Sequence, residues 1–515
     1  MLRTPYLVRA HYIIYPPPFA GYHRNMRDDD LRRVLTDANP WWRAASFGTD
    51  PLAWVGAHRL LVDRAEHDLG YRAQILDDIA TNSRVDDRLV VLTGPRRVGK
   101  SVALLDVAAA LCGRADIDPR QVIHVPCDGF ATRDLRRALS LGRELTRVID
   151  HPQSISRVWL LDEVSSIEGW TAVLKSARDG TAFGTDTVVA TGSRWSATDD
   201  VEGNLLAGRA GRAASRRVRH LLPMSFRAFL AASRPELARP PAVHPALLQT
   251  QQVAVTLDAL RFDVDAYDFA WQDYLTCGGF PRAVFEHTRI GAVSDGFLQD
   301  LAAWLRQDVD RDAPPESIPL LLDGLAMRAT SPLNQRSTAA DLGYTYDSLS
   351  LRLAKLVRNF GAIWCPQRDD RGRPVRGSQA KLYLSDPILS WVPSRLRPAC
   401  AQPAMTMLTE TTIGMHLARA IDEVDEGRLV VNDTIGYART GAGNEVDLLP
   451  VPISSASGAA RTVPIEGKWV DDQWRSDART IEAKYGNGIL ATKSILNTDH
   501  PTWAIPAPLL ALLLM

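Results

Sequence analysis

A glycine-rich stretch around residue 95 carries the clearest chemistry in this sequence. Residues 92–101 read LTGPRRVGKS, which contains the pattern G-x-x-x-x-G-K-S. Glycines in such a loop let backbone amides face a phosphate chain, and the following helix directs its positive end at the same charge. Lys100 is expected to reach the β- and γ-phosphates of ATP, and the Ser101 hydroxyl to bind Mg²⁺. The residues expected to contact ATP are Gly94, Pro95, Arg96, Arg97, Val98, Gly99, Lys100, Ser101 and Val102.

Further candidates for the same chemistry follow along the chain. In the run VWLLDE we expect Asp162 to hold Mg²⁺ through water and Glu163 to polarise the attacking water. Ser193, in the run TVVATGS, is the candidate for contact with the γ-phosphate, with a simple turn as the alternative. Arg209 is the candidate arginine finger, acting within the chain or from a neighbouring subunit of a homo-oligomer. The alternative is that Arg209 belongs to a basic stretch that faces solvent or DNA.

A second set of charged residues lies in the last quarter of the sequence. Glu410 falls at the start of a predicted helix, Asp447 in the run GNEVDLL, and Glu466 and Lys468 in the run IEGK. An acid followed by E-x-K on a neighbouring strand is typical of restriction-endonuclease-like folds, where carboxylates hold Mg²⁺ or Mn²⁺ and the lysine positions water. We therefore predict metal binding by Glu410, Asp447 and Glu466, and catalysis by Asp447, Glu466 and Lys468. The alternatives are an inactive nuclease-like fold and solvated strand ends.

The apolar pattern predicts an α/β scaffold for these residues. The runs RLVVLTG, QVIHVPCD, RVWLLDEV and TVVATGS alternate with helix-forming segments between residues 88 and 193, which favours a parallel sheet covered by helices. After residue 240 helices are predicted. From residue 409 to the end we expect a helix and then the strands RLVVND, NEVDLLPV and TVPIEGKWV, with SSASGAAR as a flexible loop. The final run PAPLLALLLM is predicted to be a buried strand or helix.

Residues 333–384 are typical of a winged helix, whose recognition helix we place at residues 346–360. The residues expected to pack inward are Leu349, Leu353, Leu356 and Phe360. The residues expected to face outward are Ser350, Arg352, Lys355 and Arg358. The wing would carry Arg368, Arg371, Arg373, Arg376 and Lys381. Basic residues on both elements favour DNA as a partner, and packing or protein contact is the alternative.

Composition sets few limits on the partner. The 515 residues include 60 lysines and arginines and 60 aspartates and glutamates, so the formal net charge is zero. The net charge therefore does not indicate a class of binding partner. The five cysteines include no C-x-x-C pair, which predicts neither disulfides nor a zinc site and favours a reducing interior. Because no apolar run reaches about eighteen residues, no membrane span is expected. We therefore expect a cytoplasmic protein.

The order GPRRVGKS, LLDEVSSIEGW, TGS, LAGR, LPMSF and GGFPRAV resembles a group of bacterial and archaeal P-loop ATPases of the AAA superfamily. The resemblance runs from about residue 39 to the end, and AKLYLSDPIL resembles the element that closes the winged helix in that group. It implies an AAA-type core with a helical lid, a winged helix and a restriction-endonuclease-like domain. The expected boundaries are an N-terminal extension at 1–55, the ATPase domain at 56–235, the lid at 236–315, the winged helix at 316–400 and the nuclease-like domain at 401–515.

Two classes of function fit this sequence. The first is an ATPase that couples Mg²⁺-dependent ATP hydrolysis to DNA binding and to metal-dependent DNA cleavage by the C-terminal domain. The second is a non-catalytic switch that binds DNA or a protein partner when it is loaded with ATP. A chaperone-like remodelling ATPase is a third reading, which the lack of a clear aromatic pore loop disfavours.

Overall fold

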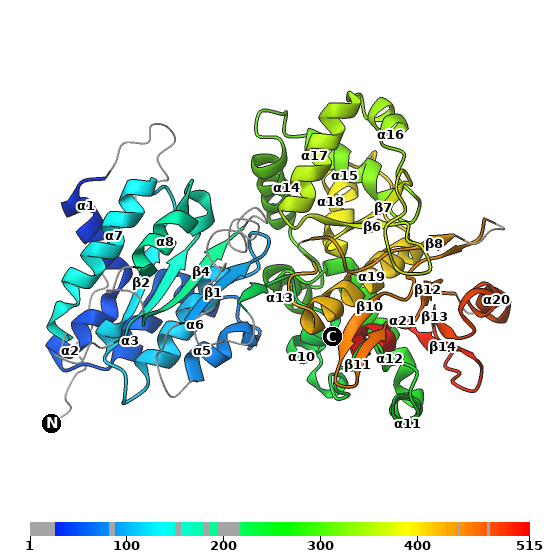
Figure 1. The fold of residues 1–515 in the computed structure, drawn as a ribbon, viewed down its shortest axis with the longest axis horizontal. Helices are drawn as coiled ribbons and strands as arrows, with labels where there is room; N and C mark the ends of the chain where they lie inside the picture. Colours follow the sequence, from blue (N-terminus) through cyan, green and yellow to red (C-terminus); the bar gives the residue numbers. More distant parts are fainter. Residues whose placement is uncertain are drawn as a thin grey trace.

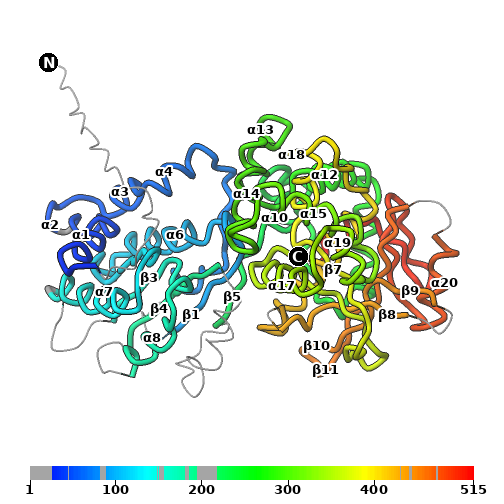
Figure 2. The backbone as a smooth tube through the Cα atoms, turned by 90° about the horizontal axis from the view of Figure 1, so that it is seen from above, coloured from blue at the N-terminus to red at the C-terminus, as the bar shows by residue number. Residues whose placement is uncertain are grey.

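The computed structural model describes residues 26–81, 88–149, 156–179, 185–193, 217–429, 431–439, 443–470 and 474–514. Figure 1 shows two lobes, a front lobe built from the described residues up to His220 and a back lobe built from the described residues that follow. In Figure 2 the green helices of the back lobe lie between the blue-to-cyan front lobe and the red end of the chain. None of the helices in the described part of the chain combines the length and apolar character that a membrane crossing requires.

A five-stranded parallel sheet in the order β2-β3-β4-β1-β5 forms the centre of the front lobe. Its strands are β1 (Arg88–Thr93), β2 (Val122–Pro126), β3 (Val158–Asp162), β4 (Thr187–Gly192) and β5 (Val218–His220). The helices around it include α1 (Asp28–Ala38), α3 (Pro51–Gly56), α5 (Asp77–Thr81), α6 (Lys100–Cys112), α7 (Thr132–Leu145) and α8 (Trp170–Asp179). The four strands predicted from the apolar runs are confirmed, and β5 was not predicted.

Alternation along the strands explains why both faces of this sheet are covered. Leu89 and Val91 pack with α1, α7 and α8, whereas Val90 and Leu92 pack with α3, α5 and α6. Successive strand side chains point to opposite faces, so a continuous apolar run needs helices on both sides. The sheet is therefore buried, and the ends of its strands are the places where polar side chains gather.

The segment before the sheet seals its outer edge. Asn39 accepts a hydrogen bond from the backbone amide of His124 at 2.6 Å and donates to its carbonyl oxygen at 2.7 Å. The indole groups of Trp41 and Trp42 both donate to the carbonyl oxygen of Val122, at 3.0 and 2.9 Å. These side chains satisfy backbone groups of β2 that an edge strand leaves unpaired. The residues around Asn39 are therefore packed against the edge strand of this sheet.

Helices dominate the first part of the back lobe. They are α10 (Phe226–Ser233), α11 (Gln251–Ala259), α12 (Val264–Cys277), α13 (Pro281–Ile290), α14 (Asp295–Val309), α15 (Ser317–Ala326), α16 (Gln335–Asp341) and α17 (Tyr346–Arg358). The antiparallel strands β6 (Ala362–Pro366) and β7 (Ala380–Leu384) form a hairpin, and α18 (Pro387–Leu396) packs against α12, α14 and α15. The four residues predicted to face inward from α17 and its end are indeed buried.

The last part of the chain contains helix α19 (Met405–Val424) and a small parallel sheet. The sheet consists of β12 (Ile465–Gly467), β13 (Gly488–Thr492) and β14 (Thr502–Pro506), with α20 (Trp474–Tyr485) between its first two strands. The predicted strand RLVVND is wrong, because the described residues there form turns. The predicted flexible loop is also wrong, because Pro452–Ser455 and Gly458–Arg461 pair as the hairpin β10–β11.

The final helix packs the end of the chain against the predicted lid. Helix α21 (Ala507–Leu514) is buried along its whole length and contacts α10, α12 and α19, which confirms the prediction of a buried final element. The backbone amide of Val243 donates to the carbonyl oxygen of Leu513 at 2.7 Å, and Gln249 donates to the carbonyl oxygen of Gly488 at 2.6 Å. The predicted lid, winged helix and C-terminal segment therefore share one apolar core.

Candidate functional site

The glycine-rich loop connects β1 to α6, as its sequence predicted. Gly99 and Arg97 have positive φ angles of 97° and 68°, which produce the sharp turn that faces the start of α6. Gly94 has a φ of 157°, and a Cβ atom there would lie 1.9 Å from the carbonyl oxygen of Leu221. Leu221, which directly follows β5, in turn donates from its amide to the carbonyl oxygen of Thr93 at 2.8 Å. The loop is thus held against the strand end by a close backbone approach that only glycine permits.

Lys100 is the first residue of α6, and its side chain contacts the glycine-rich loop. Its ammonium group donates to the carbonyl oxygens of Gly94 and Pro95 at 3.0 and 2.8 Å, and lies 3.6 Å from a carboxylate oxygen of Glu163. Burial lowers the pKa of Lys100, while the carboxylates of Glu163 and Asp162 act in the opposite direction. The lysine therefore connects the loop to the acids at the end of β3.

Asp162 and Glu163 lie at the end of β3, where the Asp162 carboxylate contacts the Ser101 hydroxyl. The Thr191 hydroxyl donates to the Asp162 carboxylate at 2.8 Å and accepts from the Glu163 backbone amide, also at 2.8 Å. Burial acts to raise the pKa of Asp162, but His124, Ser101 and Thr191 outweigh it and the pKa is lowered. An ionised carboxylate beside a hydroxyl is an oxygen donor set that suits Mg²⁺. These residues therefore fit the ATP-bound metal that the loop predicts.

Sequence reasoning missed Thr191, although it lies in the same TGS triplet as Ser193. Both side chains are buried, at 1% and 4% exposure, but it is Thr191 that bridges the two acids. Glu163 has a φ of 54°, a left-handed backbone conformation that is unfavourable for residues other than glycine. The hydrogen bond from its backbone amide to Thr191 supports this conformation. Arg209, the predicted finger, lies outside the described residues.

The two arginines of the loop contact the back lobe. The Arg96 guanidinium pairs with Asp308 through contacts of 3.0 and 3.3 Å, and Arg97 pairs with Asp300 at 3.1 Å. Both acids belong to α14, and the Trp304 indole also donates to Asp308, at 2.9 Å. The sequence predicts contact of both arginines with ATP, whereas in this structure their side chains join the loop to α14, a helix of the predicted lid.

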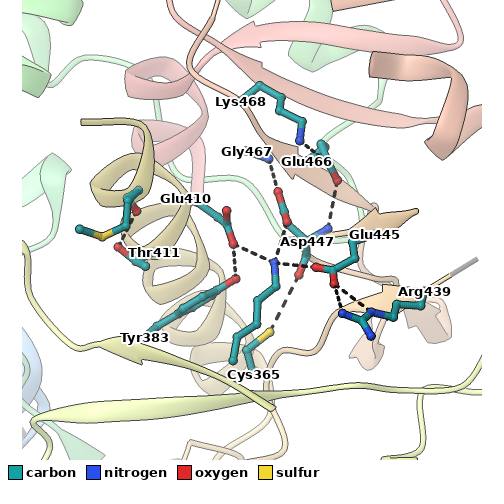
Figure 3. Close-up of polar contacts among 12 residues, drawn as sticks. Cys365, Tyr383, Glu410, Thr411, Arg439, Glu445, Asp447, Glu466, Gly467 and Lys468 are labelled. Carbon is teal, nitrogen blue, oxygen red and sulfur yellow. Dashed lines mark hydrogen bonds and ion pairs between the residues drawn. The ribbon is translucent and has the colours of Figure 1, made fainter. Parts of the chain in front are cut away.

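The acids predicted in the last quarter of the chain do converge (Figure 3). Glu410 lies in the second turn of α19, Asp447 directly follows β9 (Glu445–Val446), and Glu466 lies on β12. All three are between 5% and 7% exposed, which excludes solvated strand ends. The Asp447 amide donates to Glu466 at 3.1 Å, the Gly467 amide donates to Asp447 at 3.0 Å, and Lys468 pairs with Glu466 at 2.8 Å.

A lysine from another segment occupies the centre of this acid cluster. The ammonium group of Lys381, on β7, donates to Glu410 at 3.0 Å and to Asp447 at 2.9 Å, and lies 3.5 Å from Glu445. The Tyr383 hydroxyl donates to the same Glu410 oxygen at 2.8 Å. The prediction that Lys381 faces DNA from the wing is wrong, because its side chain is 1% exposed.

Burial dominates the electrostatics of the cluster. It raises the pKa of Glu410 to about 8 and that of Glu466 to about 7, and the charge of Asp447 adds to both shifts. For Lys381 burial opposes the charge, but Asp447 and Glu410 outweigh it and the pKa is raised. Within the described ranges no group of three histidine, cysteine or acidic side chains is arranged to hold a metal ion. The cluster as folded does not fit Mg²⁺ or Mn²⁺.

Several other basic residues of the predicted winged helix are also engaged within the protein. Arg352 pairs with Asp310 and lies over the ring of Tyr344, 4.4 Å from its centre. Arg368 is buried, pairing with Asp433 at 2.8 Å. The prediction that Arg352 and Arg368 are free to contact DNA is therefore wrong. The basic residues of these two elements that remain exposed are Arg358, Arg371, Arg373 and Arg376, of which Arg373 pairs with Asp369.

Comparison with known proteins agrees with the geometry of the first site. Residues 86–230 match the family model described as an AAA domain. The front part of the chain is therefore an ATP-binding AAA-type ATPase domain, whose chemistry implies nucleotide and, usually, Mg²⁺.

Solved structures with similarity to the chain include the Walker-type ATPase of Pyrococcus abyssi, at 15% identity and a TM-score of 0.31, which covers 59% of this chain and 90% of that one. A second is a variant of RuvB from Thermotoga maritima, at 15% identity and a TM-score of 0.26, covering 61% of this chain and 92% of that one. The search of curated proteins finds no match.

Proposed function

We propose that this protein hydrolyses ATP and uses the nucleotide cycle to control its back lobe. Lys100 would neutralise the β- and γ-phosphates, Ser101 and Asp162 would hold Mg²⁺, and Glu163 would orient the attacking water. The metal would supply charge neutralisation at the transferred phosphate. Ser193 and the arginine finger Arg209 remain candidates for sensing and stabilising the γ-phosphate.

The ion pairs between the glycine-rich loop and α14 are the observation that carries the coupling. Arg96 meets Asp308 near the end of α14, and Asp310, just beyond that end, pairs with Arg352 on α17. Helix α17 packs against β6, which pairs with β7. A change in the loop on ATP binding would thus be passed to α14, α17 and the hairpin, which would move together as one packed unit.

DNA is the proposed partner of the back lobe, through the exposed arginines of the winged helix. Arg371 and Arg376 lie on the turn between β6 and β7, and Arg358 ends α17. Arginines contribute to phosphate binding without regard to sequence. An ATP-driven switch whose back lobe does not cleave DNA fits this arrangement best, because a lysine already occupies the centre of the acid cluster.

Metal-dependent DNA cleavage is the second candidate. It is supported by the convergence of Glu410, Asp447, Glu466 and Lys468 in one buried cluster. Cleavage would require Lys381 to leave its two carboxylates before a divalent cation could enter. A supercoiled-plasmid assay with Mn²⁺ and ATP distinguishes the two candidates, since nicking by the parent but not by Asp447→Ala would establish the nuclease.

The switch is tested with two variants that stop the cycle at different points. Glu163→Gln should bind ATP without hydrolysing it, whereas Lys100→Ala should bind it poorly. Binding of a labelled duplex, measured by fluorescence anisotropy at fixed salt, should change with ATP for Glu163→Gln and stay constant for Lys100→Ala. Reversal of charge at Arg371 and Arg376 should weaken DNA binding in both nucleotide states. Equal DNA affinity with and without ATP would refute the proposed coupling. Absence of ATP turnover by the parent would refute the proposal that the protein hydrolyses ATP.

A further inference from the structure

The acid cluster is assembled from separate parts of the chain. Glu410 comes from α19, Asp447 and Glu466 come from the segment between residues 443 and 467, and Lys381 comes from the β6–β7 hairpin. The lysine lies 29 positions from Glu410 and 66 from Asp447 in the sequence. Its position is therefore a property of how the hairpin docks on the last part of the chain.

The ammonium group of Lys381 lies among three carboxylates and donates hydrogen bonds to two of them. An ammonium group has three N–H donors, and three carboxylate oxygens lie within 3.5 Å of it, from Glu410, Glu445 and Asp447. Contacts of 2.9 and 3.0 Å to Asp447 and Glu410 are ordinary lengths for charged hydrogen bonds. The lysine satisfies these acids with good geometry, as a buried charge must.

The carboxylate oxygens of Asp447 and Glu466, two of the predicted metal ligands, are already engaged. One oxygen of Asp447 accepts from Lys381 and the other from the Gly467 amide. Both oxygens of Glu466 are also occupied, by the Asp447 amide and by Lys468. A magnesium ion requires six oxygen ligands at about 2.1 Å, so these contacts would have to be exchanged before it could bind. Two lysine charges would also repel a dication at this place.

We infer that Lys381 is the resident cation of the acid cluster, replacing a divalent metal and locking the β6–β7 hairpin to α19 and to residues 445–447. The cluster is then an internal ion network that joins the predicted winged helix to the last part of the chain. This inference holds whether or not the front lobe hydrolyses ATP, since the cluster contains no residue of the nucleotide site.

Binding of Mn²⁺ to the nucleotide-free full chain tests this inference. Titration followed by electron paramagnetic resonance counts bound ions in the parent, Asp447→Asn, Lys381→Met and the double variant. We expect parent and Asp447→Asn to bind the same number of ions. Lys381→Met, which keeps the length of the side chain without its charge, should gain one ion, and the double variant should lose that ion again.

Melting temperature gives a second readout. Lys381→Met should melt below the parent, because it leaves buried acids without their cation, and Mn²⁺ should raise its melting temperature while leaving that of the parent unchanged. Loss of one bound ion from the parent on Asp447→Asn would overturn the inference, as would failure of folded Lys381→Met to gain one. If Lys381→Met does not fold, the comparison of the parent with Asp447→Asn decides alone.

Discussion

Replacing Thr191 by valine is the sharpest test of how the end of β4 arranges Asp162 and Glu163, the two acids proposed to serve ATP hydrolysis. Valine keeps the shape of the side chain and removes only the hydroxyl, which donates to Asp162 and accepts from the Glu163 amide. Thr191 is 1% exposed, so solvent does not replace the lost partner. Without its acceptor, Glu163 loses the contact that supports its left-handed backbone conformation.

The size of the effect follows from the two hydrogen bonds. A hydrogen bond to a charged group contributes about 1.5–3 kcal/mol and a neutral one about 0.5–1.5 kcal/mol. Because part of this loss falls on folding rather than on the reaction, we expect about 1–3 kcal/mol in the barrier, or about a 5- to 150-fold fall in kcat. The KM for ATP should change by less than about threefold, because the loop that holds the phosphates is untouched.

Steady-state ATP hydrolysis by the parent, Thr191→Val and Thr191→Ser measures both constants. Serine retains the hydroxyl and should restore most of kcat, which separates loss of the hydrogen bonds from loss of packing. A kcat for Thr191→Val within about twofold of the parent would refute the role given to the hydroxyl. Equal losses in the serine and valine variants would assign the effect to packing instead.

Three further perturbations test other parts of the structure. Gly94→Ala should lose binding of a fluorescent ATP analogue, because its Cβ would lie 1.9 Å from the Leu221 carbonyl oxygen; unchanged affinity would contradict this approach. Asp308→Asn should lower the melting temperature more than Asp300→Asn does. The Asp308 carboxylate is 2% exposed and its ion pair with Arg96 contributes about 1–2 kcal/mol, whereas both partners of the Arg97–Asp300 pair are about 40% exposed. Equal shifts in melting temperature would contradict this difference between the two pairs. Burial lowers the pKa of His416 from 6.5 to about 3, so stability should fall as pH drops below 6.5, where the unfolded chain binds a proton that the folded chain cannot. His416→Gln should flatten that fall in melting temperature between about pH 6.5 and 3, and an identical slope would refute the assignment.

The nucleotide site could be predicted because its signals are local. The residues from Gly94 to Ser101 follow one another in the chain, and the two acids end an unbroken apolar run. Parallel strands bring such ends to one edge, so sequence alone could place Lys100 near Glu163. Strand β5 was missed because its three residues, Val218 to His220, carry no apolar run.

The partners of the basic residues could not be predicted, because a cation has the same sequence signature whether it faces solvent or a distant acid. Arg96 and Asp308 are 212 positions apart, and Arg368 and Asp433 are 65 apart. Which acid a given arginine or lysine pairs with depends on how distant segments of the chain pack together. For this reason the sequence predicted a basic wing, whereas the structure buries Lys381 among acids.

The buried lysine bears on what ATP could control in the back lobe. The β6–β7 hairpin can move away from α19 only if Lys381 leaves its carboxylates. This withdrawal is unfavourable, because leaving buried carboxylates without a cation costs several kcal/mol. Nucleotide-driven withdrawal of Lys381 would need to offset that cost, which exceeds the contribution of the Arg96–Asp308 pair alone. The arrangement therefore favours a hairpin that stays docked through the ATP cycle. ATP-dependent motion would then fall on the junction between α14 and the glycine-rich loop, where the ion pairs are fewer and more exposed.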